Sequence, residues 1–328
     1  MQSCLAAVPC PPPVFVIAAM SSTPRPALFA DLLLLAVALV WGSSYGVVKE
    51  ALLVYPVLGL VSLRFALTFV LLSPALRDLR GLERGDATAV AGASLLLLCI
   101  FIAETFGVRH TQASSAAFLI SLCVVLTPLV EWMWLKRVPR PIEWVAAGMS
   151  LAGAFLIGGG SLSLTPGNTL MILAALLRAV NVCVTKRAMQ SGRVPALALT
   201  AAQSGVVAVG CLLLAWLTGR DQWQPLPSLA GHPAFWGYVG YLVLGCTLFA
   251  FFVQNYAVHR SSATRVALLM GSEPVFGALF AYIWLGERPT PSSWAGGALI
   301  VAASAFATLA TKTSCAANKA LSAAGKPA

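Results

Sequence analysis

The chain has 328 residues, of which 59% are apolar and only 10% are charged. An ordinary soluble domain is about 45–50% apolar and about 25% charged, so this chain has too few charges to keep a globule of its size in solution. Intrinsic disorder is excluded because disordered chains lack apolar residues, and the class that remains is a polytopic membrane protein.

Ten apolar stretches are long enough to be membrane spans, each of which needs about 20 mainly apolar residues. We expect all of them to be helical, because lipid cannot satisfy the backbone polar groups of an open strand. In chain order the predicted spans are 32–52, 56–74, 89–108, 113–135, 141–158, 167–186, 196–217, 235–256, 262–285 and 291–311.

The two ends of the chain differ from the rest. Residues 1–30 hold a short apolar run that is too short to span and lacks the basic start of a signal peptide, so we expect a disordered N-terminal tail. Residues 312–328 are rich in small and basic residues, and we expect them to form a cytoplasmic C-terminal tail.

The net charge of +10 comes mainly from Lys and Arg in the connections between spans. With the N-terminus placed inside, 14 of the 21 basic residues lie on the inner side, three on the outer side and four within spans. Cytoplasmic loops of membrane proteins carry such an excess. The bias predicts an inner (plasma) membrane protein with both termini in the cytoplasm, and it explains the charge without a nucleic-acid partner.

Two parts of the sequence repeat each other. Residues 106–157 align without a gap with residues 256–307, and 12 of the 52 positions are identical, including a Trp-Leu pair and a Pro-x-Pro motif in register. We therefore divide the chain into two repeats, residues 31–158 and 167–311. Because each repeat has five spans, the second enters the membrane from the opposite side. The predicted fold is an all-α integral membrane protein of two inverted five-helix repeats. Many secondary transporters have this architecture, and the alternative to a transport function is an inert duplicated scaffold.

Several short motifs resemble those of EamA-type members of the drug/metabolite transporter superfamily. They are Trp41-Gly42-Ser43-Ser44-Tyr45, Arg64-Phe65, Phe118-Leu119 to Pro128 with Lys136-Arg137-Val138-Pro139, Gly271-Ser272-Glu273-Pro274-Val275-Phe276-Gly277, and Trp284-Leu285-Gly286-Glu287-Arg288. The resemblance covers residues 32–311 and implies a ten-helix inner-membrane carrier, usually an exporter of amino acids, other metabolites or drugs. The chain departs from a common pattern of the family, because Gly-Glu-Arg stands only in the second half.

Ionisable side chains deep in a span cost at least about 2.5–3.5 kcal/mol each, which makes them candidates for function. Arg64, Arg178 and Glu273 lie near the middle of the second, sixth and ninth spans. These positions come from both repeats, as a shared midplane cavity requires. The predicted substrate-binding residues are Arg64, Glu273, Arg178, Asn181, Trp41, Ser44, Tyr45 and Gln203.

Each of these residues also has a structural interpretation. Arg64 and Glu273 could form an ion pair that is buried from lipid and never touches substrate. Trp41 and Tyr45 could serve packing or an interfacial belt, and the spacing of Gly42 and Gly46 favours close helix approach. Glu104 and Glu131 lie about one turn from a span end, where we expect them to snorkel to the interface or to pair with Arg109 and Lys136 rather than to enter the site.

Prolines interrupt two spans, the fourth and the ninth, that align with each other in the two repeats. Pro274 stands between Gly271 and Gly277 in the ninth span, and Pro128 lies in the fourth. Proline removes one backbone hydrogen bond and clashes with the preceding turn, and the freed carbonyl is tolerated only where protein or a water-filled cavity receives it. We predict that these four residues line the cavity or form a gate; the alternative is a static packing kink.

The predicted function is secondary transport, in the direction of export, of small organic metabolites such as amino acids or organic anions. No Gly-x-x-x-x-Gly-Lys-Ser/Thr loop is present for ATP, and no His-Glu-x-x-His motif favours a membrane enzyme. A non-transporting membrane subunit is a further alternative. We expect no cofactor and no metal; the expected partners are a small-molecule substrate and membrane lipid, and the protein is expected to be a monomer or homodimer.

The charges within the spans indicate a substrate class. Arg64 and Arg178 against Glu273 leave a surplus of one positive charge, which favours an anionic or zwitterionic solute. The alternative is an exporter of drugs or other cationic or aromatic compounds. A proton-coupled exporter of that kind is expected to have a carboxylate deep in the first span, which offers only Asp31 and Glu50 at its ends.

Overall fold

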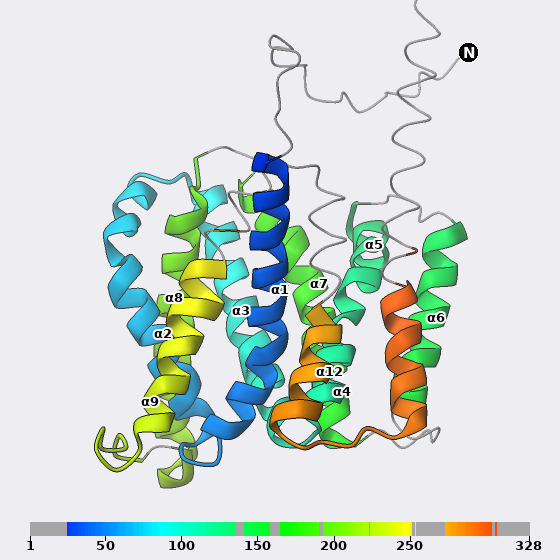
Figure 1. The fold of residues 1–328 in the computed structure, drawn as a ribbon. Coiled ribbons are helices and arrows are strands. Elements are labelled where there is room, and N and C mark those ends of the chain that lie inside the picture. Colours follow the sequence, from blue (N-terminus) through cyan, green and yellow to red (C-terminus); the bar gives the residue numbers. More distant parts are fainter. Residues whose placement is uncertain are drawn as a thin grey trace, which may run out of the picture.

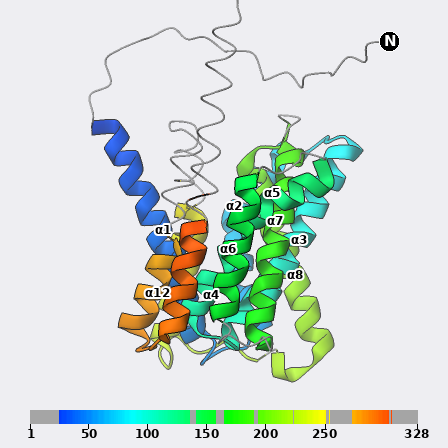
Figure 2. The same cartoon turned by 90° about the vertical axis from the view of Figure 1, so that its right-hand side faces the viewer.

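The computed structural model describes residues 25–135, 141–157, 165–189, 193–222, 224–250 and 273–303, together with residues 253 and 306. All regular structure within these residues is helical, and most of the helices stand side by side in one bundle (Figure 1; Figure 2). Residues 1–24 and the predicted C-terminal tail lie outside the described part of the chain.

The helices of the first half follow the predicted spans with two differences. The first helix begins at Arg25, so the tail predicted over residues 1–30 is too long by six residues. The predicted span 113–135 is divided at Ser121 into two helices. The elements are α1 (Arg25–Ala51), α2 (Val57–Leu72), a 3-10 segment (Ser73–Leu79), α3 (Arg84–Arg109), α4 (Ala113–Ile120), α5 (Leu122–Leu135) and α6 (Pro141–Ile157).

The second half contains a long π-helix, which hydropathy does not reveal. This segment, Tyr241–Phe249, continues directly from α9 within the predicted span 235–256. Most of the first part of the predicted span 262–285 lies outside the described residues. The elements are α7 (Pro166–Met189), α8 (Ala196–Thr218), a 3-10 turn (Arg220–Gln222), α9 (Pro233–Gly240), the π-helix η3 (Tyr241–Phe249), α12 (Glu273–Trp284) and a last helical stretch over 291–303.

Prolines set several helix starts. Pro141, Pro166 and Pro233 are the first residues of α6, α7 and α9, and Pro56 and Pro195 stand directly before α2 and α8. Proline suits these positions because its fixed φ is helical and its missing N–H would have no partner in the first turn. The prolines that interrupt the apolar sequence therefore divide it into separate helices.

Five of the described helical segments are long and apolar enough to cross a membrane: Leu32–Ala51, Val57–Leu79, Arg84–Arg109, Pro166–Thr185 and Ala196–Thr218. Large apolar side chains such as Val70, Leu213 and Ile283 are exposed on the outside of the bundle. A soluble protein rarely exposes so many, whereas a lipid-facing surface is apolar.

The two halves pack into each other rather than side by side. The most extensive helix contacts pair α3 with α7, α2 with α8 and α1 with α12, and each pair joins one half to the other. Lys49 near the end of α1 and Asn168 near the start of α7 both bond to Thr111, so these two helices run in opposite directions. The first helices of the two repeats are therefore inverted relative to each other, as predicted.

Glycine allows the closest of these helix contacts. A Cβ atom on Gly42 of α1 would lie 2.5 Å from the carbonyl oxygen of Glu273 in α12, and a Cβ on Gly277 would collide with Ala117 of α4. Small residues let helix backbones approach in this way within membranes. The packing interpretation of Gly42 is confirmed, and α1, α4 and α12 meet tightly at this point.

Candidate functional site

Charged and polar side chains from both halves meet inside the bundle. Arg178 of α7 pairs with Glu104 of α3, with 2.9 Å between Nη2 and Oε2. The hydroxyl of Tyr45 in α1 donates to Oε1 of Glu273 in α12 at 3.1 Å. Arg64 of α2 lies within electrostatic range of Glu104, Arg178 and Tyr45. We call these five residues the charge cluster.

The partner of Arg178 was not foreseen from the sequence. Glu104 was expected to snorkel or to pair with Arg109, but it bonds to Arg178 because α3 and α7 pack closely and Arg178 reaches across their interface. Glu131, the other carboxylate set aside above, has a side chain that lies outside the described residues. The charge cluster therefore has two cations and two carboxylates, so the surplus positive charge inferred from the sequence is wrong.

Arg64 has aromatic neighbours and no acidic partner among the described residues. Its Nη2 donates to Oγ1 of Thr247 at 3.3 Å, and its guanidinium carbon lies 5.3 Å and 5.2 Å from the ring centroids of Phe65 and Phe101. Its Nε is buried without a hydrogen-bond partner. The ion pair with Glu273 that the sequence allowed is not formed, so neither charge neutralises the other.

A small cavity of about 20 Å³ adjoins Arg64. This volume is enough for one water molecule. The hydroxyl of Ser204 is buried there without a partner, so the cavity holds unsatisfied polar atoms as well as aromatic walls. Its lining residues are Arg64, Phe65, Leu97, Phe101, Thr200, Gln203, Ser204 and Thr247.

The remaining predicted binding residues divide into two groups. Gln203 lines the cavity beside Arg64, and Asn181, one turn after Arg178, has a buried Oδ1 without a partner. Trp41 instead donates its indole N–H to the carbonyl of Cys246 in η3 at 2.8 Å, and Ser44 bonds to the carbonyl of Trp41. The structure thus brings Gln203 to Arg64, whereas Trp41 joins α1 to η3 and Ser44 bonds within α1.

The predicted kink residues are placed only in part. Pro274 and Gly277 lie within α12, Pro128 lies within α5 with its side chain outside the described residues, and Gly271 lies outside them altogether. Gly277 packs tightly against α4 and α1, which favours a packing role at that position. A gate at these four residues stays a prediction.

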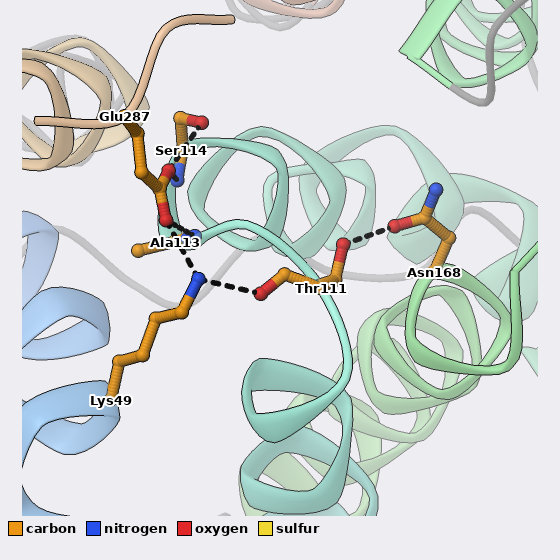
Figure 3. Close-up of polar contacts among 6 residues, drawn as sticks. All are labelled: Lys49, Thr111, Ala113, Ser114, Asn168 and Glu287. Carbon is orange, nitrogen blue, oxygen red and sulfur yellow. Dashed lines mark hydrogen bonds and ion pairs between the residues drawn. The ribbon is translucent and has the colours of Figure 1, made fainter. Parts of the chain in front are cut away.

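A second polar cluster lies at one end of the bundle and is centred on Glu287 (Figure 3). Its Oε1 pairs with Nζ of Lys49 at 2.8 Å and accepts the backbone N–H of Ala113 at 2.8 Å. Its Oε2 accepts the backbone N–H of Ser114 at 3.1 Å and the Ser114 hydroxyl at 2.9 Å. Lys49 also donates to the carbonyl of Thr111, whose hydroxyl bonds to Asn168. We call these six residues the Glu287 cluster.

The Gly-Glu motif explains how this cluster forms. Gly286 has φ of 65°, a left-handed conformation that favours glycine, and it turns the chain directly after α12. The turn is fixed by a bond from the N–H of Glu287 to the carbonyl of Ala281 at 3.1 Å. The Glu287 carboxylate then reaches the free N–H groups at the start of α4, where helix geometry leaves donors unpaired and favours negative charge.

The environment of Glu287 keeps its carboxylate ionised. Burial raises the pKa of this carboxyl, but hydrogen bonds from Lys49 and from the backbone of Ala113 and Ser114 outweigh burial. The net result is a pKa below the ordinary value of 4.5. Lys49 and Glu287 were absent from the predicted site; the signal that could have found them was a lysine at the end of a span together with the Gly-Glu motif.

A third polar contact ties the halves together at the other end of the bundle. Arg193, just before α8, pairs through Nε with Oδ2 of Asp86 at 2.9 Å and through its other nitrogens with Glu83. About half of the Arg193 side chain is exposed, as is more than half of Glu83. We call this end the Arg193 end and the opposite one the Glu287 end.

The architecture and the sequence agree with one family. Residues 28–159 and 165–309 each match the EamA-like transporter family. The chain belongs to the EamA-like transporter family. It is a multi-pass membrane transporter and not an enzyme, and its two family domains correspond to the two halves that pack into each other.

Known relatives of this EamA-family chain span most of its length. An uncharacterized transporter of Archaeoglobus fulgidus is 26% identical over 84% of this chain and 84% of its own, and the uncharacterized inner membrane transporter YedA of Escherichia coli K12 is 26% identical over 84% and 89%. A protein of Streptantibioticus cattleyicolor named "Probable terminal-alkyne amino-acid exporter" is 26% identical over 80% and 87%. A crystal structure that is 20% identical matches with a TM-score of 0.60 over 87% of this chain and 98% of that chain, which shows the fold alone.

Proposed function

We propose that this transporter exports small zwitterionic metabolites, amino acids among them, by secondary transport. The observation that carries the proposal is the pairing within the charge cluster. Arg178 and Glu104 neutralise each other, whereas Arg64 and Glu273 have no ion-pair partner among the described residues. A zwitterion supplies the two missing charges, a carboxylate for Arg64 and an ammonium group for Glu273.

The surroundings of the two unpaired charges support this assignment. Arg64 is held by aromatic faces and one hydroxyl, and its cavity offers the unpartnered hydroxyl of Ser204 as a second donor. Guanidinium groups bind carboxylates in a two-pronged geometry that a lysine cannot reproduce. Glu273 retains acceptor capacity beyond its bond to Tyr45, which an ammonium group can use.

The location of the cluster supports transport between two sides. Arg64 and Glu104 belong to the first half and Arg178 and Glu273 to the second, so movement of the halves changes the site. Sites between inverted repeats near the bilayer midplane are typical of secondary transporters. The name of the Streptantibioticus relative supports an amino-acid substrate and export, at 26% identity.

Counterflow in proteoliposomes tests the substrate class. The purified protein is reconstituted with mixed unlabelled amino acids inside, and uptake of labelled amino acids is compared with that of the matching decarboxylated amines and N-acetylated acids. We expect exchange of amino acids and little exchange of either analogue. Equal uptake of the amines would contradict the proposal and favour an exporter of cationic compounds, which is the alternative within the same fold.

Variants of the two unpaired charges sharpen this test. Arg64→Ala should abolish exchange while the protein still inserts, and Arg64→Lys should restore only part of it. Glu273→Gln should lose pH-driven flux if this carboxylate carries the coupled proton, yet keep residual exchange. Glu83→Gln, an exposed carboxylate at the Arg193 end, is the matched control and should leave exchange unchanged. Exchange at the wild-type rate in both Arg64 variants would show that Arg64 does not bind the substrate.

A further inference from the structure

The Glu287 cluster joins segments that are far apart in the chain. Lys49 comes from α1, Ala113 and Ser114 from the start of α4, Asn168 from α7, and Glu287 from the turn after α12 (Figure 3). Lys49 and α4 belong to the first half, whereas Asn168 and Glu287 belong to the second. The Glu287 carboxylate and the bond between Thr111 and Asn168 therefore join the two halves at this end.

The Glu287 cluster lies beyond the charge cluster, at the Glu287 end of the bundle. Lys49 follows Tyr45 by one turn of α1, on the same face of the helix. Thr111 follows Glu104 by seven residues, and Asn168 precedes Arg178 by ten, so two more chain segments lead from the charge cluster to this end. A solute that leaves the charge cluster in this direction meets the Glu287 cluster.

The helix that Glu287 caps fills the space at this end. All eight residues of α4 are buried, and its Ala117 is in tight contact with Gly277 of α12. The Glu287 side chain is only 9% exposed. Among the described residues, α4 packs against α1, α7 and α12 and so fills the space between the charge cluster and the Glu287 end.

We propose that the Glu287 cluster is the lock of a gate, and that each transport cycle breaks its bonds between Glu287, Lys49 and the start of α4 to open this end. The proposal rests on the proposed transport function. The predicted orientation places this end outside the cell, so that the lock closes the exit used in export. Because Glu287 also caps α4, opening requires α12 and its turn to move away from α4 as a unit.

The lock can be tested without knowing the substrate. Ala113→Cys is introduced into a variant without native cysteines, since the Ala113 side chain is buried and only its backbone takes part in the lock. Labelling by a membrane-impermeant maleimide is measured from each side, in intact cells and in inside-out vesicles. The locked protein should label slowly, and Glu287→Gln should raise the rate about tenfold from one side only.

Two further variants keep the test decisive. Lys49→Gln leaves the backbone bonds of Glu287 in place and should raise labelling less than Glu287→Gln does. Arg193→Gln, which breaks the ion pairs at the opposite end, should leave labelling of Ala113→Cys unchanged. Thermal unfolding and gel filtration of each variant show that increased labelling does not come from unfolding.

The outcomes separate the lock from the proposed function. Unchanged labelling in well-folded Glu287→Gln and Lys49→Gln proteins overturns the lock, whatever the substrate is. Equal increases from both sides also overturn it, because they indicate general loosening. Increased one-sided labelling together with failure of all amino-acid exchange supports the lock and rejects the zwitterion proposal alone.

Discussion

Among the described residues, both ends of the bundle are crossed by ion pairs between the halves, but the carboxylate at one end is buried and the pairs at the other end are largely exposed. At the Glu287 end a carboxylate that is 9% exposed binds a lysine, a hydroxyl and two backbone N–H groups. At the Arg193 end the side chains of Arg193 and Glu83 are 50% and 69% exposed, and their partners are other side chains.

From this difference we expect burial and the type of partner to matter more than the number of charges. Exposed pairs are weakened by water and salt and must hold two flexible side chains in place. Glu287 is bound by rigid backbone groups at a helix start, where charge-assisted hydrogen bonds are short and strong. The asymmetry explains why we assign the lock to one end and expect the other to be the easier one to open.

Removing the Glu287 carboxylate should have the largest effect on stability. Glu287→Ala leaves Lys49 and the start of α4 without their partner, and we expect unfolding to become easier by about 2–3 kcal/mol, somewhat less than for a fully buried pair because Lys49 is partly exposed. Thermal unfolding in detergent measures this loss. A loss no larger than that of Arg193→Gln would remove the contrast between the two ends.

The turn that positions Glu287 should show the next largest effect. Gly286→Ala places a side chain on a residue with φ of 65°, which costs about 1–2 kcal/mol. Gly81→Ala is a matched control, because Gly81 has φ of 80° and lies near the Arg193 end. Both should lower the melting temperature, but only Gly286→Ala should raise labelling of Ala113→Cys. Equal labelling of the two would show that the turn does not position the lock.

Much of the fold could be predicted from the sequence, because lipid imposes a minimum length on apolar helices and prolines mark their starts. The division at Ser121 and the π-helix Tyr241–Phe249 could not, since both change hydrogen bonding without changing hydropathy. The inverted arrangement followed from the odd number of spans in each repeat. The sequence order alone did not indicate that α2 and α8, or α3 and α7, pack together.

The site was predictable in its components but not in its pairing. Arg64, Arg178 and Glu273 stood out because charge is costly within a span. The partner of Arg178 is 74 residues away, on a helix whose contact with α7 only the fold reveals. Glu287 was visible as part of a motif, yet its function as a helix cap depends on residues 173 and 174 positions earlier. Long-range pairing of this kind leaves no periodic signal in one sequence.

The stability that Glu287 gives to its end of the bundle should depend on pH. Because the pKa of Glu287 is lowered on folding, its contribution to stability is present above the ordinary value of 4.5 and is lost as pH falls through the lower folded pKa. Lys49 is the charged group that contacts it, and the neighbouring Arg109, His110 and Arg288 are exposed. The melting-temperature gap between wild type and Glu287→Gln should stay constant from pH 8 to about 5 and shrink below about 4.5. A gap that closes near pH 6 would contradict the lowered pKa.

The smallest effect is expected at the Arg193 end. Glu83 and Asp86 raise the pKa of Arg193, but this side chain is well exposed, so water and salt weaken its ion pairs. Arg193→Gln should therefore leave the melting temperature almost unchanged, and any small loss should disappear at about 0.5 M salt, where the screening length is only a few ångströms. The loss in Glu287→Ala should largely persist at the same salt concentration, because bonds to backbone N–H groups at a buried helix start are screened much less. Thermal unfolding of both variants at low and high salt gives the comparison. A salt-resistant loss in Arg193→Gln as large as that in Glu287→Ala would mean that both ends are locked, and the assignment of one gate would then have to be abandoned.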